Sequence, residues 1–269
     1  MTSPCSFVHC GDPDGPLLIA LHGVTDCAAS LAGLPSMLPG YHVVLIDAPG
    51  HGLSPALDDV ALQQPATAFA ALYASIAETI ATLCKRYGPA VLVGHSMGGA
   101  VATALAAERK ELVRALIAED PAYLSEAART HYRTTQVPAS LHTLRTSRRD
   151  PHLALQLNAR LYPHWDEAER AGWLQGKILA DERFVALGVV TPEQPWQELL
   201  AAVSAPTLVL TGDGADVILG PAGLEKIRRV RPATQVALIP GARHCVRRDR
   251  PGPYAHHVHR FLAGLGPAA

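Results

Sequence analysis

The sequence predicts an α/β protein with a doubly wound, mostly parallel sheet. Short apolar runs recur along the 269 residues, and each of them stops at a Gly, Pro or Asp. Runs without apolar–polar alternation are typical of strands that are buried on both faces, as in a parallel sheet. Segments with helical spacing of apolar residues separate these runs. This alternation of strands and helices indicates helices on both sides of one sheet.

Seven apolar runs are the predicted strands. They comprise Phe7–His9, Leu17–Gly23, Val43–Ile46, Ala90–Val93, Leu116–Ala118, Thr207–Leu210 and Gln235–Ile239. Apolar residues at three- and four-residue spacing predict helices over Thr67–Tyr87 and Tyr254–Leu265. The Ala-rich segment Gly99–Arg109 predicts a third helix that lies close against the sheet.

One long stretch, from about residue 122 to 203, contains no convincing strand. Its leucines and tryptophans, interrupted by five prolines, predict several short helices. A helical insertion between two strands of one sheet is expected to cover the carboxyl ends of the strands. We therefore predict a core domain formed by residues 1–121 and 204–269, with residues 122–203 as a helical cap.

Composition excludes several function classes. Apolar residues make up 48% of the chain and charged residues 17%, as in ordinary globular proteins. A net charge of −1 provides no basic field for nucleic acid or an anionic membrane. We find no signal peptide and no apolar run of membrane-spanning length. The five scattered cysteines form no C-x-x-C pair, so we expect reduced thiols in a cytoplasmic protein and no metal site. We also expect a monomer or homodimer.

The segment Gly94-His95-Ser96-Met97-Gly98 has the pattern G-x-S-x-G. An apolar strand precedes it and a helix of small residues follows, which is the setting of a nucleophile elbow. Such a tight turn holds its serine in strained backbone and exposes the hydroxyl. The two glycines are expected where neighbouring chain passes close. The alternative is an ordinary turn between a strand and a helix.

The chain resembles the α/β-hydrolase fold family over nearly its whole length. The resemblance rests on Leu21-His22-Gly23, the segment from Asp47 to Ser54, the GHSMGG segment from Gly94 to Gly99, Glu119-Asp120-Pro121, and the segment from Pro240 to His244. It implies an eight-stranded, mostly parallel sheet with a cap. It also implies a catalytic triad in the chain order Ser, acid, His.

The base and the acid are predicted by position. His244 follows the last predicted strand, in the loop that delivers the base in the family. Asp213 and Asp216 both follow Thr207–Leu210, where the family usually keeps its acid. In the common family form the acid follows a Gly by three or four residues, so the resemblance favours Asp216 after Gly212. Asp213, directly after that Gly, is the alternative, and Asp120 is a third candidate.

Two backbone amides are expected to bind the developing oxyanion. The resemblance places them at Met97, after the nucleophile, and at Val24, after His22-Gly23. By contrast, the segment from Asp47 to Ser54 is interpreted as a conformational turn, because Asp47 can accept hydrogen bonds from local amides.

These residues predict a serine esterase that cleaves a small carboxylic ester or lactone through an acyl-enzyme, without metal or organic cofactor. The alternatives are a C–C bond hydrolase or cofactor-free oxygenase with the same triad, and a non-catalytic ligand-binding protein. Lys177, the single lysine of the predicted cap, raises the further alternative of a cyanohydrin lyase. Arginines near His244 and in the cap indicate either a pocket for an anionic substrate or solvated surface.

Overall fold

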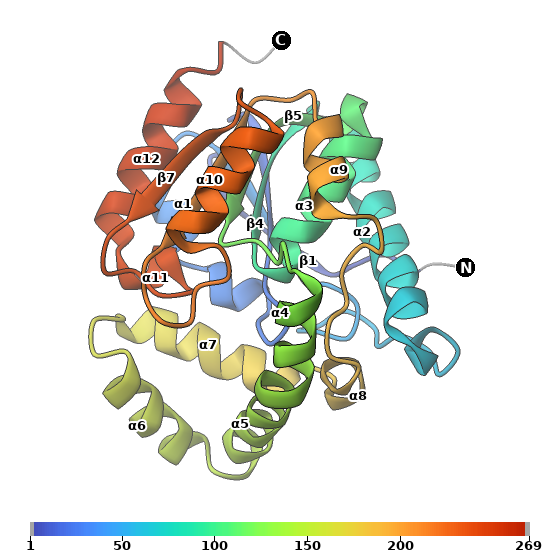
Figure 1. The fold of residues 1–269 in the computed structure, drawn as a ribbon, viewed down its shortest axis with the longest axis vertical. Coiled ribbons are helices and arrows are strands. Elements are labelled where there is room, and N and C mark those ends of the chain that lie inside the picture. The colour runs from blue at the N-terminus through green and yellow to red at the C-terminus, as the bar shows by residue number, and fades with distance from the viewer. Residues whose placement is uncertain (1–2, 267–269) are drawn as a thin grey trace.

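A computed structural model describes residues 3–266 and contains a seven-stranded sheet in the order β1-β3-β2-β4-β5-β6-β7 (Figure 1). The strands are β1 (Phe7–Gly11), β2 (Leu17–Leu21), β3 (His42–Ile46), β4 (Ala90–His95), β5 (Val113–Glu119), β6 (Thr207–Gly212) and β7 (Gln235–Ile239). β1 pairs with β3 in antiparallel register, and every other neighbouring pair is parallel. The fold is thus the predicted α/β-hydrolase fold.

The seven observed strands are the seven apolar runs of the sequence. The eighth strand that the resemblance implied is absent from the described residues 3–266, so that expectation is wrong for this part of the chain. In β2, β3 and β4 every residue is buried, which explains why these runs show no alternation. The outer strands β1 and β7 contain exposed residues, since each has a neighbouring strand on one side only.

Helices cover both faces of the sheet (Figure 1). On one face, α2 (Pro65–Tyr87) and α3 (Met97–Glu108) pack on Ile19, Val44 and Leu92. On the other face, α12 (Pro251–Ala263) shares a buried apolar cluster with the next residues along the same strands, including Leu18, Val43 and Val91. The remaining core helices are η1 (Ala28–Leu31), α1 (Leu34–Met37), η2 (Ala61–Gln63), η3 (Lys110–Leu112), α9 (Trp196–Ala202), α10 (Gly220–Val230) and α11 (Val246–Asp249).

Between β5 and β6 the chain is helical. It forms α4 (Glu126–His131), a π-helical turn η4 (Tyr132–Gln136), α5 (Val137–Arg149), α6 (Pro151–Leu161), α7 (Glu167–Leu179) and α8 (Glu182–Ala186). In Figure 1, α5, α6 and α7 lie together at one end of the molecule, below the sheet. Aspartates begin three of these helices, because Asp150, Asp166 and Asp181 each accept a hydrogen bond from a first-turn amide. The predicted helical insertion is present, whereas α9 at its end packs against α3 of the core.

Helix α7 lies directly on the chain that follows β2. Ser30 Oγ donates to the carbonyl oxygen of Gly172 over 3.0 Å. A Cβ on Gly172 would overlap the carbonyl oxygen of Ala29, and one on Gly176 would lie 2.8 Å from Asp26 Cα. The two glycines therefore let the helix backbone touch the core backbone, which fixes one side of the insertion on the core.

One helix, α2, is long and apolar enough to cross a membrane by length and composition alone. Half of its most apolar window is buried inside the protein, as in the central helices of many globular domains. The helix is weak evidence for a membrane span.

Replacing Gly172 with Ala is expected to destabilise the protein, because the new methyl group meets backbone that cannot rotate away. Overpacking lowers the free energy of unfolding by about 1–3 kcal/mol, and the higher helix propensity of Ala offsets about 1 kcal/mol of this loss. The net cost is up to about 2 kcal/mol, so thermal unfolding should show a melting temperature lowered by up to roughly 6 °C. The matched control is Gly252→Ala in α12, where the added methyl group has no neighbour within 4 Å. Equal melting temperatures for both variants would contradict the proposed packing.

Candidate active site

Ser96 occupies the turn between β4 and α3 in strained backbone. Its φ of 54° and ψ of −117° lie in a region that residues other than glycine rarely adopt. The amide of Ser96 donates to Glu119 O over 3.0 Å, and the carbonyl of Ser96 accepts from the amides of Gly99 and Ala122. These bonds hold the strain in place. The turn has the geometry of a nucleophile elbow.

Close backbone contacts explain the glycines of the elbow. A Cβ on Gly94 would overlap the carbonyl of Gly98, and a Cβ on Gly98 would overlap the carbonyl of Leu21 at the end of β2. The sequence-based reason for these glycines, close passage of neighbouring chain, is therefore confirmed.

His244 reaches the same region from the loop between β7 and α11. Its ring nitrogen Nδ1 lies 2.6 Å from Asp120 Oδ2. The carbonyl oxygen of His244 lies 3.1 Å from His95 Nε2, which ties the loop to the end of β4. Ser96 and His244 both line one large cavity. The structure thus brings together the predicted nucleophile and the predicted base.

The carboxylate that contacts the His244 ring is that of Asp120, whereas the sequence favoured Asp216. Asp120 is fully buried, directly after β5. Its carboxylate accepts hydrogen bonds from Thr211 Oγ1 at 2.7 Å, from the amide of Ile218 at 2.8 Å and from the amide of Leu219 at 3.0 Å. The remaining contact of this carboxylate is the one with His244.

The two loop aspartates have other partners. Asp216 Oδ1 accepts from the backbone amide of His244 over 3.2 Å, and its Oδ2 pairs with Arg243 at 3.1 Å. Asp213 Oδ1 accepts from the amide of Gly241 over 2.7 Å. Neither contacts the imidazole ring, so the preferred assignment and its alternative are both corrected in favour of Asp120. The physical reason is strand order: β5 pairs directly with β4, which places Asp120 beside the elbow.

Buried hydrogen bonds shift both ionisable groups of this pair. Burial alone would raise the pKa of Asp120, but hydrogen bonds from His244, Ile218 and Thr211 lower it below its usual range. Burial alone would lower the pKa of His244, but the hydrogen bond to Asp120 raises it above the ordinary value of 6.5. Asp120 therefore remains ionised and favours the protonated imidazolium of His244.

The predicted oxyanion amides, Val24 and Met97, both belong to residues that line the cavity. Met97 is the first residue of α3, so its amide has no acceptor within the helix. The carbonyl oxygen of Val24 lies 2.7 Å from His51 Nε2, so His51 anchors the peptide group between Val24 and Thr25. The binding of an oxyanion by these two amides stays a prediction.

His22 shapes the same turn. Its Nδ1 lies 2.8 Å from Gly23 O, and its Nε2 accepts from the amide of Ala48 over 3.0 Å. Burial and the nearby His51 lower the pKa of His22 to about 3. The ring is therefore neutral, with its proton on Nδ1 and directed at Gly23. Asp47 binds the amides of Ala28 and Leu53, which confirms that its segment is a conformational turn.

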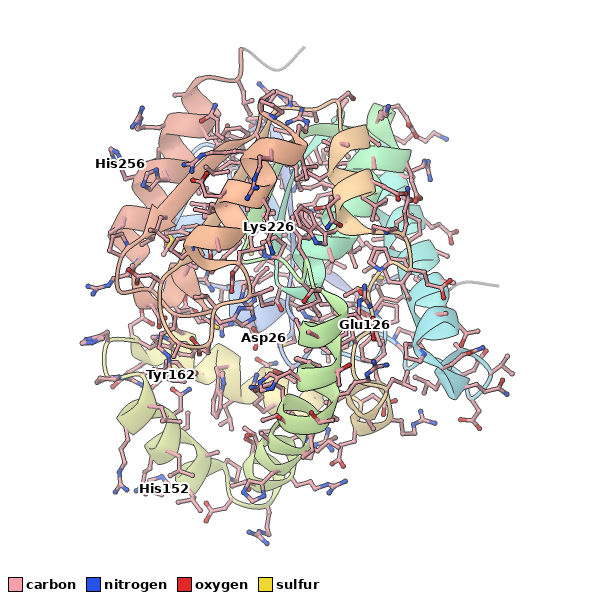
Figure 2. The ribbon with its side chains drawn as sticks, in the orientation of Figure 1. Asp26, Glu126, His152, Tyr162, Lys226 and His256 are labelled. Atoms are coloured by element: carbon pink, nitrogen blue, oxygen red, sulfur yellow. The ribbon has the colours of Figure 1, made fainter. Side chains whose placement is uncertain are left out.

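A cluster of buried charges joins α7 to the core beside this turn. Lys177 pairs with Asp26 at 3.1 Å, and Arg248 pairs with Asp26 at 2.9 Å and with Glu169 at 3.2 Å. Arg247 also pairs with Glu169. Figure 2 shows Asp26 in the layer between the sheet and the cap helices. The sequence had suggested that the arginines near His244 are either solvated surface or cations that could bind an anionic substrate. Arg247 and Arg248 are neither, because buried carboxylates already pair with both of them.

The cavity has a volume of about 520 Å³, which suits a small organic molecule. Its floor contains Ser96, Met97 and His244, and its cap wall contains Leu144, Trp165, Trp173 and Val190. Trp165 Nε1 donates to Asp249 over 2.6 Å, so this tryptophan is anchored to α11. Within residues 3–266 no group of three His, Cys, Asp or Glu side chains is arranged to hold a metal ion.

Comparison with known proteins identifies the family. The model of the Alpha/beta hydrolase family matches residues 18–257, so the chain belongs to this family. It is 26% identical to the sn-1-specific diacylglycerol lipase of Mus musculus, over 94% of this chain and 83% of the mouse protein. It is 27% identical to the 2-(acetamidomethylene)succinate hydrolase of Mesorhizobium japonicum, over 88% of this chain and 84% of that protein. The crystal structure of an E-2-(acetamidomethylene)succinate hydrolase superimposes with a TM-score of 0.78 and 23% identity, over 97% and 95% of the two chains.

The Asp120–His244 contact predicts a change in the titration of the imidazole. Replacing Asp120 with Asn should lower the pKa of His244 below its ordinary value, because burial remains while the stabilising carboxylate is lost. An NMR titration of the His244 ring measures this pKa. The control is Asp216→Asn, which should leave the pKa nearly unchanged because Asp216 binds only the backbone amide of His244. A larger shift in the control than in Asp120→Asn would restore Asp216 as the partner of the ring.

Proposed function

We propose that this protein is a serine hydrolase that cleaves a small carboxylic ester or lactone. The observation that carries the proposal is one cavity lined by a serine in a strained elbow and by a histidine whose ring is bound to a buried aspartate. A neutral imidazole in contact with a serine hydroxyl can take its proton. The aspartate holds the ring in the tautomer with its proton on Nδ1 and leaves Nε2 free to act.

In the proposed reaction, Ser96 Oγ attacks the ester carbonyl carbon while its proton passes to Nε2 of His244. The carbonyl electron pair becomes the oxyanion of a tetrahedral intermediate. When this intermediate collapses, the bond to the alcohol oxygen breaks, and His244 protonates the leaving alcohol. Water then attacks the acyl group on Ser96 and gives a proton to His244. Loss of the carboxylic acid returns that proton to Ser96.

The Val24 and Met97 amides are proposed to receive the oxyanion in both halves of the reaction. Removing one such donor typically costs about 10²–10³-fold in turnover. Because the donors belong to the backbone, their placement depends on what holds the turn at Val24. His22, His51 and Lys177 hold it, the last by donating to both oxygens of Thr25 over 2.7 Å.

Two relatives support an ester as the substrate. The mouse relative is named a diacylglycerol lipase, and an Escherichia coli relative with 23% identity over 91% of this chain is named an esterase. The Mesorhizobium relative, by contrast, is named for a substituted succinate and does not support this choice. The proposal needs no metal or organic cofactor, because the groups that move protons and stabilise charge all belong to the chain.

Ser96→Ala is expected to abolish hydrolysis of p-nitrophenyl butyrate, because the attacking oxygen is lost. Residual turnover should be at least about 10³-fold below that of the wild type. The same variant should lose covalent labelling by a fluorophosphonate probe, as read by intact-protein mass spectrometry. Circular dichroism serves as the folding control. Labelling at an unchanged rate in the variant would refute the assignment of Ser96.

Turnover should rise with pH, because His244 must be neutral to accept the serine proton. Its raised pKa places the midpoint of the rise above the ordinary value of 6.5. A rate that stays flat from about pH 5 to 8 in the wild type would argue against His244 as the base.

Asp120→Asn should lower turnover by about 10³–10⁴-fold, since the ring is no longer held in one tautomer and loses the negative charge beside it. The midpoint of any residual activity should then move to lower pH.

A further inference from the structure

Two side chains carry the permanent positive charge of the cavity wall. Among the described residues, Lys177 and Arg248 are the lysine and arginine that line the cavity. Lys177 comes from α7 of the cap and Arg248 from α11 of the core. Both are bound to one carboxylate, that of Asp26, at 3.1 and 2.9 Å. The wall therefore contains cations that are already neutralised.

The hydrogen-bond donors of Lys177 are fully used. An ammonium group has three N–H bonds, and Lys177 Nζ has three acceptors: Thr25 O at 2.7 Å, Thr25 Oγ1 at 2.7 Å and Asp26 Oδ1 at 3.1 Å. The ammonium group also lies 5.5 Å from the ring centroid of Trp173, an aromatic side chain of the wall. A substrate carboxylate could gain a hydrogen bond from Lys177 only by displacing one of these acceptors.

Arg248 is nearly as fully engaged. Four of the five N–H bonds of its guanidinium have acceptors, namely Glu169 Oε2 at 3.2 Å, Asp26 Oδ2 at 2.9 Å, Ser30 O at 2.9 Å and Cys245 Sγ at 3.7 Å. Its charge is shared by two carboxylates, and its guanidinium carbon lies 5.0 Å from the ring centroid of Trp165. One N–H bond of the Arg248 guanidinium remains without an acceptor, and the positive charge of the group is already paired with carboxylates.

Carboxylates outnumber cations in the wall and directly behind it. Six carboxylates lie there, those of Asp26, Glu119, Asp120, Glu169, Asp216 and Asp249, together with four cations, those of Lys177, Arg243, Arg247 and Arg248. Moving a carboxylate from water against such a wall is costly unless a free cation pairs with it. The excess of negative charge adds repulsion to that cost.

We propose that the cavity selects esters whose acyl and alcohol parts carry no charge, and that Asp26 sets this selectivity by binding both cations of the wall. The inference rests on the proposed ester hydrolysis and names its substrate class. The apolar side chains of Leu144, Trp173 and Val190 then contact the uncharged acyl chain or alcohol. An ester with a free carboxylate is excluded even when it has the same length.

The test compares three p-nitrophenyl esters that differ at the far end of the acyl chain. They are the hexanoate, the adipate monomethyl ester and the adipate monoanion, assayed at about pH 8 with spontaneous hydrolysis subtracted. The two uncharged esters should have similar kcat/KM, whereas the monoanion should be at least about 100-fold poorer than its methyl ester. A monoanion within threefold of the methyl ester would overturn the inference. This comparison uses the wild-type protein and depends on no variant.

Asp26→Asn tests the residue itself. The substitution leaves Lys177 and Arg248 with one negative charge fewer, so the preference for the methyl ester over the monoanion should fall at least about tenfold. The ratio of the two kcat/KM values cancels any general loss of activity from destabilisation. The control is Asp213→Asn, because Asp213 lies outside the cavity lining and binds the amide of Gly241. An unchanged ratio in folded Asp26→Asn, or an equal fall in the control, would overturn the role of Asp26.

The outcomes separate this inference from the proposed function. If no ester is cleaved and Ser96 is not labelled, ester hydrolysis itself is wrong. If all three esters are cleaved at similar rates, the protein is an esterase without charge selectivity, and the inference alone fails.

Discussion

The hydrogen bond between Asp120 and His244 joins segments that are 124 residues apart, and the geometry of the site depends on it. Asp120 is immobile because three further donors hold its carboxylate. It lies beside the elbow because β5 pairs with β4. An ionised carboxylate in a buried position is stable only when its hydrogen bonds are satisfied. The end of β6 and the loop from β6 to α10, which supply those donors, therefore support the site without providing the carboxylate that contacts the His244 ring.

The buried charges between α7 and the core have a comparable role on the other side of the cavity. Breaking a buried ion pair by removing one partner typically costs about 3–5 kcal/mol, because the remaining charge is left without compensation. Asp26, Glu169, Lys177, Arg247 and Arg248 compensate one another within a few ångströms. With the glycine contacts of α7, they make this helix a continuous part of the core. The cap wall that carries Trp173 is thus fixed relative to the turn at Val24.

The strands and the elbow could be predicted because their information is local. The central strands β2, β3 and β4 are buried on both faces and therefore read as uninterrupted apolar runs, whichever strands lie beside them. The elbow is recognised by its glycine pattern between a strand and a helix, and these glycines are required because the backbone of Leu21 and Gly98 lies too close for a Cβ atom. The eighth strand came from the family resemblance and not from any apolar run, and the described part of the chain does not contain it.

The acid and the buried cluster could not be predicted in the same way. Three aspartates follow strands at the same edge of the sheet, and each has turn-like neighbours in the sequence. Asp120 follows β5, whereas Asp213 and Asp216 follow β6, and only the place of these strands in the sheet distinguishes the three. Likewise, Lys177 and Arg248 look like surface residues of a helix and a loop until folding brings Asp26 between them, 151 and 222 residues away in the chain.

By itself, the sequence determined the α/β alternation, the strained serine turn and the histidine that follows the last strand, because neighbouring residues encode strand burial and turn geometry. Only the tertiary structure decided which carboxylate meets that histidine and whether the arginines near it are free. Both depend on strand order and on contacts between distant segments, which no local pattern of residues specifies.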